Sequence, residues 1–258
     1  DVVDANIGKF QDPALTAKGE PRATVSLTNP QTLWFNTGTL CNIECVNCYI
    51  ASSPTNDALV YITADEVRDY LGQITQRNWP VTEIAFTGGE PFMNPQMTNA
   101  MRPMMRKSVQ AGLVRLNEAY PGKLTLRISV DHYRTDLHDA ERGAGALEKT
   151  VTGMKWLRDN NIRMAVAGRS VFGATDEDSR AGYGAFYAEH NFDIDPQDPG
   201  MTVLFPEMDE TVEVPEITTA CWGILDKSPD AVMCSSSRMV VKRKGAATPA
   251  VLACTLLP

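Results

Sequence analysis

Three cysteines stand within a stretch of eight residues, and they constrain this chain more than any other feature. Cys41, Cys45 and Cys48 are separated by three and then two residues. Thiolates held this close together are suited to bind one shared inorganic centre, and the spacing permits three ligands to a single four-iron cluster. Because no fourth cysteine follows nearby, one iron would stay open to an outside ligand. The segment therefore predicts an iron–sulfur cluster with a free coordination site.

A structural zinc ion and a redox-active cysteine pair are the alternatives for these thiols. Structural zinc takes four ligands, usually in two pairs separated by a longer gap. Here one tight triad has no nearby fourth cysteine or histidine. The pattern therefore favours iron–sulfur, and a metal analysis that found zinc without sulfide would select the other interpretation.

A glycine motif lies about forty residues further on, after a run of strand-forming residues at 83–87. Glycine lets the backbone approach a ligand closely. Gly-Gly and Pro also punctuate ordinary strand-to-helix turns, so the motif on its own leaves both interpretations open. Its residues are Gly88, Gly89, Glu90 and Pro91.

Together, the cysteine and glycine motifs resemble those of the radical S-adenosylmethionine (SAM) superfamily. An aromatic residue, Tyr49, follows the third cysteine, and the resemblance continues at 128–131 and 138–139, over most of the chain. It implies a [4Fe–4S] cluster on the three cysteines, with SAM chelated at the open iron. The reduced cluster would pass one electron to SAM, which would break into methionine and a 5′-deoxyadenosyl radical. That radical would take a hydrogen atom from a substrate.

The resemblance also assigns residues to SAM. Backbone carbonyls of the glycine motif, with Glu90 nearby, suit the ammonium group of the methionine moiety. Ser129 and Asp131 alternate onto one face of a strand end, where the family places ribose and carboxylate contacts and where a solvated edge is the alternative. The guanidinium of Arg169 is shaped to bind a carboxylate bidentately, or it is a surface arginine. The predicted cofactor-binding residues are Tyr49, Gly88, Gly89, Glu90, Pro91, Ser129, Asp131 and Arg169.

Two further residues qualify the resemblance. Asn47 stands where the family usually has an aromatic residue or histidine, directly before the third cysteine. The cluster potential or the packing of SAM can therefore differ in this chain. We interpret His138 as structural.

Strand-like and helix-like stretches alternate along the chain, which predicts an α/β fold with a parallel sheet and right-handed crossovers. Five strands fall short of the eight of a closed barrel, and the resemblance implies a partial (β/α)6 TIM-like barrel with a small C-terminal β-hairpin extension. We expect an N-terminal arm at 1–30, a radical SAM partial barrel at 31–215 and an extension at 216–258. The predicted strands are 32–36, 83–87, 124–130, 162–167 and 201–205, and the predicted helices start at 63, 94, 145 and 176.

The extension carries the other three cysteines, Cys221, Cys234 and Cys254. Two predicted strands, 237–242 and 250–253, surround Gly245, and a cysteine before and after such a hairpin resembles the start of a SPASM or twitch extension. That resemblance implies ligands for an auxiliary [4Fe–4S] cluster, although the later, denser cysteine cluster of these extensions is missing. Small buried hydrophobic side chains are the alternative. Since the chain starts at Asp1 and ends after an apolar segment, we expect an excised piece of a longer protein.

Charge and hydropathy exclude several classes of protein. The net charge is −8 and no basic run occurs, which argues against a nucleic-acid partner. We find no apolar run of eighteen or more residues and no secretory signal, so we expect no membrane partner. Closely spaced thiols without an export signal indicate metal ligands in a reducing compartment, the cytoplasm.

The most favoured function is that of a radical SAM oxidoreductase that tailors a peptide or a small molecule and takes electrons from a reductant such as flavodoxin or ferredoxin. A molybdopterin-type nucleotide cyclase is one alternative, but the glycine–arginine tail of that group is not present. A non-catalytic iron–sulfur electron carrier is another, although such a carrier needs no ammonium pocket.

Overall fold

The computed structural model describes residues 8–95, 107–170, 174–206 and 211–255. Contacts divide the chain into two compact units, which are described separately. The first unit comprises Asp1–Asn36, Asp65–Thr87 and Asp209–Pro258, and the second comprises Thr37–Ala64 and Gly88–Met208. This division follows contacts and not function, so the predicted division at residues 30 and 215 stays a prediction.

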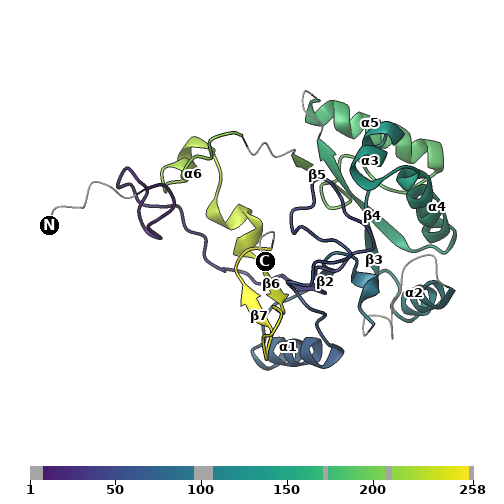
Figure 1. Cartoon of the computed structure of the whole chain (residues 1–258), viewed down its shortest axis with the longest axis horizontal. Coiled ribbons are helices and arrows are strands. Elements are labelled where there is room, and N and C mark those ends of the chain that lie inside the picture. The colour runs from purple at the N-terminus through teal and green to yellow at the C-terminus, as the bar shows by residue number, and fades with distance from the viewer. Residues whose placement is uncertain (1–7, 96–106, 171–173, 207–210, 256–258) are drawn as a thin grey trace. The chain divides into compact units, whose positions relative to one another are not determined.

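The first unit is built on a four-stranded sheet with the order β2-β1-β6-β7. The predicted strands form β1 (Thr32–Asn36) and β2 (Glu83–Thr87), which pair in parallel. The predicted C-terminal hairpin is confirmed as β6 (Ser237–Val241) and β7 (Ala250–Leu252), which run antiparallel side by side (Figure 1). β6 also pairs in parallel with β1, so the hairpin continues the sheet that contains the first strand.

Aromatic and aliphatic side chains on β1 and β6 form the core of this unit. Phe35 is fully buried, stacks on Phe86 with 5.5 Å between ring centroids, and meets Tyr70 of helix α1 (Ala64–Gln76) edge-on at 6.1 Å. Val240 of β6 is also fully buried. β2 contributes little to this core, because none of its residues is buried.

The second unit contains a three-stranded parallel sheet with the order β3-β4-β5. The predicted strands are confirmed as β3 (Thr125–Ser129), β4 (Arg163–Ser170) and β5 (Thr202–Pro206). All three carboxyl ends therefore lie at one edge of the sheet, the edge where parallel α/β folds place their chemistry.

Helices cover this sheet, and most of them match the predicted periodicity. The helix predicted from 94 lies partly outside the described residues. Its described part includes Leu113, which is fully buried. The described helices are α2 (Lys107–Ala119), α3 (Thr135–Arg142), α4 (Ala146–Asp159) and α5 (Asp176–His190), with a short α6 (Cys221–Ile224) in the first unit.

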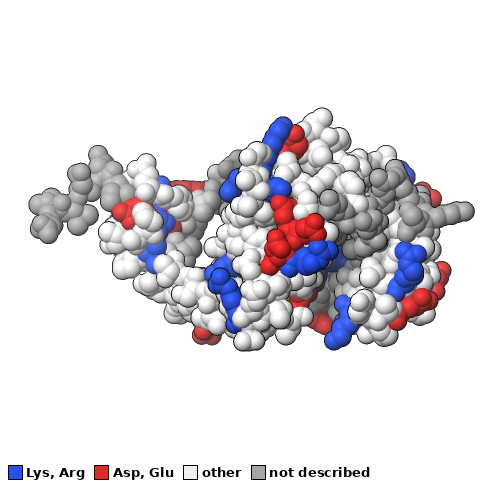
Figure 2. Space-filling view, turned by 90° about the horizontal axis from the view of Figure 1, so that it is seen from below, with Lys and Arg blue, Asp and Glu red and all other residues white. Residues whose placement is uncertain are grey.

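Charged side chains of both signs are visible on one face of the molecule (Figure 2). On the face shown in Figure 2, Lys and Arg stand in small groups among Asp and Glu. Within the described ranges no helix is long and apolar enough to cross a membrane.

Tyr183 of α5 ties that helix to the end of β3. Its ring is completely buried, and its hydroxyl lies 2.8 Å from the carbonyl oxygen of Val130 and 2.9 Å from that of Asp131. One hydroxyl group thus lies within hydrogen-bonding distance of two carbonyl acceptors directly after β3. These contacts fix the position of α5 relative to the end of that strand.

Replacing Tyr183 with Phe should lower the free energy of unfolding by about 1–3 kcal/mol, because buried carbonyl groups lose a hydrogen-bond donor. Urea denaturation followed by circular dichroism measures this change. Tyr120→Phe is the matched control, because Tyr120 is 61% exposed and its hydroxyl can bond to water. Equal unfolding midpoints for the two variants would contradict the assigned role.

Candidate functional site at the cysteine loop

The three motif cysteines lie on one loop, residues 41–48, which we call the cysteine loop. It belongs to the second unit. Cys41 is buried, and Cys45 and Cys48 are partly buried. The loop is fixed by its own backbone: the N–H of Cys41 donates to the carbonyl of Ser53 at 3.0 Å, and the N–H of Cys48 donates to that of Cys45 at 3.3 Å.

The environment of the thiols is partly apolar and partly polar. Burial raises the pKa of Cys41 and of Cys45, and the neighbouring cysteines act in the same direction. The backbone N–H of Ser52 donates to the Sγ of Cys48 at 3.2 Å, a contact that also stabilises a metal-bound thiolate. Within the described residues, no three His, Cys, Asp or Glu side chains are arranged as a site for a single metal ion.

The glycine motif packs against the segment that leads into the cysteine loop. Gly88 has a φ of 141°, a conformation that residues with a Cβ rarely adopt. A Cβ at Gly89 would lie 2.5 Å from the carbonyl oxygen of Leu40, and one at Gly88 would lie 2.7 Å from that of Gly38. The N–H of Gly89 donates a hydrogen bond to the carbonyl oxygen of Gly38 at 2.8 Å. The protein's own backbone therefore fills the space that the glycines leave.

Glu90 brings a carboxylate to the same place. Its side chain accepts a hydrogen bond from the N–H of Phe92 at 2.9 Å, and burial raises its pKa. Its charge is close enough to raise the pKa of Cys41. A carboxylate next to the thiol of the first cysteine is therefore available to a cation bound beside the loop. Pro91 opens a short 3-10 helix directly after it.

Asp131 and Arg169, both predicted from sequence, lie together at the carboxyl ends of β3 and β4. Asp131 is only 6% exposed. Its carboxylate receives the Nη2 of Arg142 at 3.2 Å and the Nε of Arg169 at 3.4 Å, and the Nε of Arg142 also bonds to it. A buried carboxylate needs such partners, so Asp131 acts first as the anchor of two guanidinium groups. Ser129 ends β3 and is partly buried.

Arg142 is a site residue that sequence analysis missed. Burial opposes its charge, but the hydrogen bond that it donates to Asp131 prevails and, with the charges of Cys45 and Cys41, raises the pKa of Arg142. Burial raises the pKa of Cys45 and of Glu90, and the same cation partly offsets that rise. It therefore lies among the cysteine loop, the glycine motif and the end of β3. Its spacing of eleven residues from Asp131 has no local periodicity that could have revealed it.

Three further residues named from the sequence lie in this region of the chain. Tyr49 is 47% exposed. His138 is fully buried, and neither ring nitrogen has a hydrogen-bond partner among the described residues. Asp139 caps the start of α4, where its carboxylate accepts from the N–H of Gly145 at 2.6 Å and of Leu147 at 2.9 Å.

The remaining three cysteines belong to the first unit. Cys221 begins α6, and its Sγ lies 3.4 Å from the N–H of Thr218 and 3.5 Å from its hydroxyl. These hydrogen bonds lower the pKa of Cys221. Cys234 and Cys254 are partly buried.

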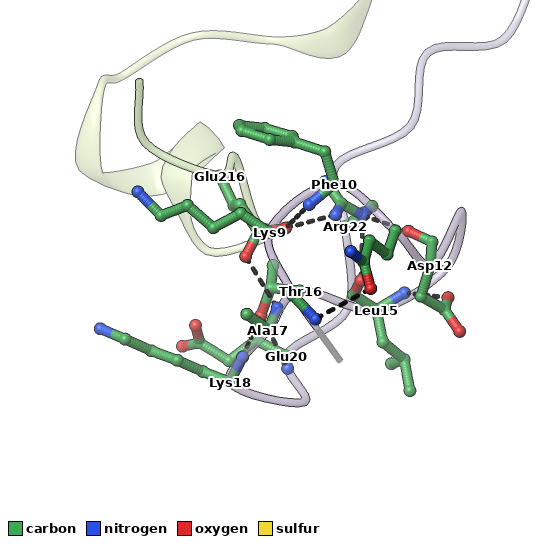
Figure 3. Close-up of polar contacts among 12 residues, drawn as sticks. Lys9, Phe10, Asp12, Leu15, Thr16, Ala17, Lys18, Glu20, Arg22 and Glu216 are labelled. Atoms are coloured by element: carbon green, nitrogen blue, oxygen red, sulfur yellow. Dashed lines mark hydrogen bonds and ion pairs between the residues drawn. The ribbon is translucent and has the colours of Figure 1, made fainter. Parts of the chain in front are cut away.

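The N-terminal arm, to which sequence analysis assigned no role, orders the segment before Cys221. The contacts between the arm and this segment centre on Glu216. Its carboxylate accepts hydrogen bonds from the N–H of Phe10 at 2.9 Å and from the N–H of Ala17 at 2.7 Å, and it forms an ion pair with Arg22 (Figure 3). Further along, the N–H of Ala23 donates to the carbonyl of Ile217 at 2.8 Å. The arm is therefore packed against the chain that leads into α6.

Comparison with protein families places these motifs in context. The profile described as the radical SAM superfamily matches residues 35–180, a range that includes the cysteine loop, the glycine motif and the ends of β3 and β4. The antilisterial bacteriocin subtilosin biosynthesis protein AlbA of Bacillus subtilis is 28% identical over 144 residues. That alignment covers 51% of this chain and 31% of AlbA, so the chain spans about a third of this relative.

Solved structures share the fold. SuiB of Streptococcus suis, bound to S-adenosylmethionine, superimposes with a TM-score of 0.54 over 89% of this chain and 59% of SuiB, at 12% identity. Native anSMEcpe with bound AdoMet gives a TM-score of 0.51 over 74% of this chain and 55% of that protein, at 13% identity. At these identities the likeness speaks for the fold alone, and it confirms the expected α/β partial barrel.

Replacing Gly89 with Ala should separate the glycine motif from the cysteine loop, because the new methyl group would overlap the backbone at Leu40. We expect a loss of about 1–3 kcal/mol in the free energy of unfolding, measured by urea denaturation. Gly72→Ala in α1 is the control: nothing lies within 4 Å of a Cβ there, so that variant should be unchanged or stabilised by up to about 1 kcal/mol. A G89A protein as stable as wild type would show that the close approach is not required.

Proposed function

We propose a function from one premise: the chain belongs to the radical SAM superfamily. The cofactors of this family are a [4Fe–4S] cluster and S-adenosylmethionine. The proposed activity is the reductive cleavage of SAM, followed by abstraction of a hydrogen atom from a peptide substrate. One observation carries the proposal: within one unit, the glycine–glutamate motif is hydrogen-bonded, backbone to backbone, to the segment that leads into the three-cysteine loop.

The cysteine loop suits the cluster in its donor set. Cys41, Cys45 and Cys48 provide three thiols, and the N–H of Ser52 is already directed at one of them. When bound and reduced, the cluster supplies the electron that cleaves SAM to methionine and a 5′-deoxyadenosyl radical. Everything else that we assign to the chain is positioning, exclusion of water and charge compensation.

The residues around the loop would orient SAM. Glu90 offers a partly buried carboxylate to the ammonium group, next to Cys41. Arg169 offers a guanidinium to the carboxylate group, and Ser129 a hydroxyl to the ribose. Direct contacts from Asp131, Tyr49 and the other residues of the glycine motif stay predictions. The hydrogen bonds that Asp131 accepts from Arg142 and Arg169 support a role in which it holds these cations in place.

We propose a peptide as the substrate over a free small molecule. The support is AlbA, whose name describes the biosynthesis of the bacteriocin subtilosin. A tailoring oxidoreductase of this kind would need a protein reductant such as flavodoxin or ferredoxin and the reducing conditions of the cytoplasm.

We also propose that Cys221, Cys234 and Cys254 are ligands of an auxiliary [4Fe–4S] cluster in the extension at 216–258. The lowered pKa of Cys221 supports this role, because only the thiolate binds metal. The auxiliary cluster would ligate the substrate or accept an electron from the product radical.

Replacing Cys45 with Ala should abolish formation of 5′-deoxyadenosine from SAM, because a cluster with two protein thiolates is not held. The assay uses protein reconstituted anaerobically with iron and sulfide and reduced with dithionite. Val46→Ala is the control, since Val46 is 73% exposed between two cysteines. Full SAM cleavage by the C45A variant would sink the assignment, and SAM binding without cleavage by wild type would favour an electron carrier.

Iron counting tests the auxiliary site. Wild type should hold about eight irons per chain if both clusters form and about four if only the cysteine loop is loaded. Replacing Cys221 with Ala should lower the count from about eight to about four and leave 5′-deoxyadenosine formation intact. A count of about four in wild type, unchanged in C221A, would refute the auxiliary ligands in this chain.

A further inference from the structure

The last turn of α3 reaches the middle of the cysteine loop. The backbone carbonyl of Glu141 accepts a hydrogen bond from the N–H of Val46 at 3.2 Å, and its side-chain Oε1 accepts one from the Nδ2 of Asn47 at 2.9 Å. The final carbonyl groups of a helix have no partner within the helix. Because the helix ends at Gly143, with a φ of 98°, the carbonyl of Glu141 is one of these and is available to the loop.

β4 holds the same point of the loop from another direction. The Nη2 of Arg169 donates to the carbonyl oxygen of Asn47 at 2.6 Å. Asn47 is thus held by its side chain from α3 and by its backbone from β4, and both contacts fall between Cys45 and Cys48. The two bonds fix the peptide that separates these thiols.

The turn that supplies Glu141 is itself anchored. Its neighbour Arg142 forms two hydrogen bonds with the carboxylate of Asp131, which is 6% exposed and lies at the end of β3. On the same helix His138 is fully buried. A rigid turn can transmit position to a loop, whereas a mobile surface helix cannot. The Oε2 of Glu141 is shielded from solvent and has no described hydrogen-bond partner, so the orientation of this carboxylate is set by Asn47.

We propose that Glu141 and Arg142, the last turn of α3, position the cysteine loop, with Glu141 holding Val46 and Asn47 and Arg142 fixing the turn on Asp131. Glu141 is a positioning residue and touches no reacting atom. The pairing uses the amide of Asn47, the residue that stands where the resemblance leads one to expect an aromatic ring or histidine. The inference rests on the proposed function for its catalytic readout, but the contacts are those of the polypeptide itself.

The test exchanges the two partners of the hydrogen bond. Asn47→Asp places two carboxylates opposite each other, and Glu141→Gln leaves two amides. The double variant N47D/E141Q restores one donor and one acceptor in reversed order. Using the full chain, we would measure iron retained against a chelator, the KM for SAM separately from kcat, and backbone hydrogen exchange at residues 45–48 before iron is added.

N47D should raise the KM for SAM by about three- to tenfold, the range of a lost net hydrogen bond. It should also speed iron loss by a similar factor and accelerate hydrogen exchange of the Val46 amide. E141Q alone should have a smaller effect, because its Oε1 still accepts. The double variant should return to within about twofold of wild type. Glu148→Gln is the control for charge, because Glu148 is exposed on the next helix.

Two outcomes would overturn the proposal: N47D equal to wild type in exchange and iron retention, or a folded double variant no better than N47D. Failure of the proposed function looks different. In that case wild type would not cleave SAM, while N47D would still accelerate hydrogen exchange at Val46 relative to the double variant.

Discussion

The carboxylate of Asp131 is the point on which the second unit's site depends. It lies at the end of β3, is almost completely buried, and meets guanidinium groups from the end of α3 and from β4. A buried charge is costly unless it is paired and hydrogen-bonded, and removal of one partner leaves the other uncompensated. Three elements of the second unit are therefore held together by charge, while the hydroxyl of Tyr183 fixes the backbone at the same position.

The glycine motif shows a second constraint, which is steric. Its two glycines let the chain after β2 press against the backbone before Cys41, at distances that no side chain would permit. The motif is therefore part of the support of the cysteine loop as well as a candidate ammonium site. Because the two backbone segments lie so close together, Glu90 is next to the first cysteine. Its carboxylate can bind a cation there.

The two sets of cysteines differ in how they are supported. The cysteine loop is held within the second unit by backbone, by Arg169 and by the last turn of α3. Cys221 follows a segment in which Glu216 accepts hydrogen bonds from backbone N–H groups of the N-terminal arm. The described part of the arm, residues 8–30, for which the sequence offered no function, thus contributes to the order of the first unit, and the hairpin predicted at the C-terminus extends the sheet begun by β1.

Sequence by itself determined the local features of this protein: the cysteine spacing, the glycine motif, the five parallel strands and the C-terminal hairpin. Periodicity and turn chemistry depend on neighbouring residues, so a linear pattern records them. Tertiary structure alone decided that Asp131 faces Arg142 and Arg169 and that Glu141, 94 residues away from Asn47, holds the cysteine loop. Such pairs form because parallel strands and their crossover helices bring distant ends to one edge, and no spacing along the chain encodes which charges will meet there.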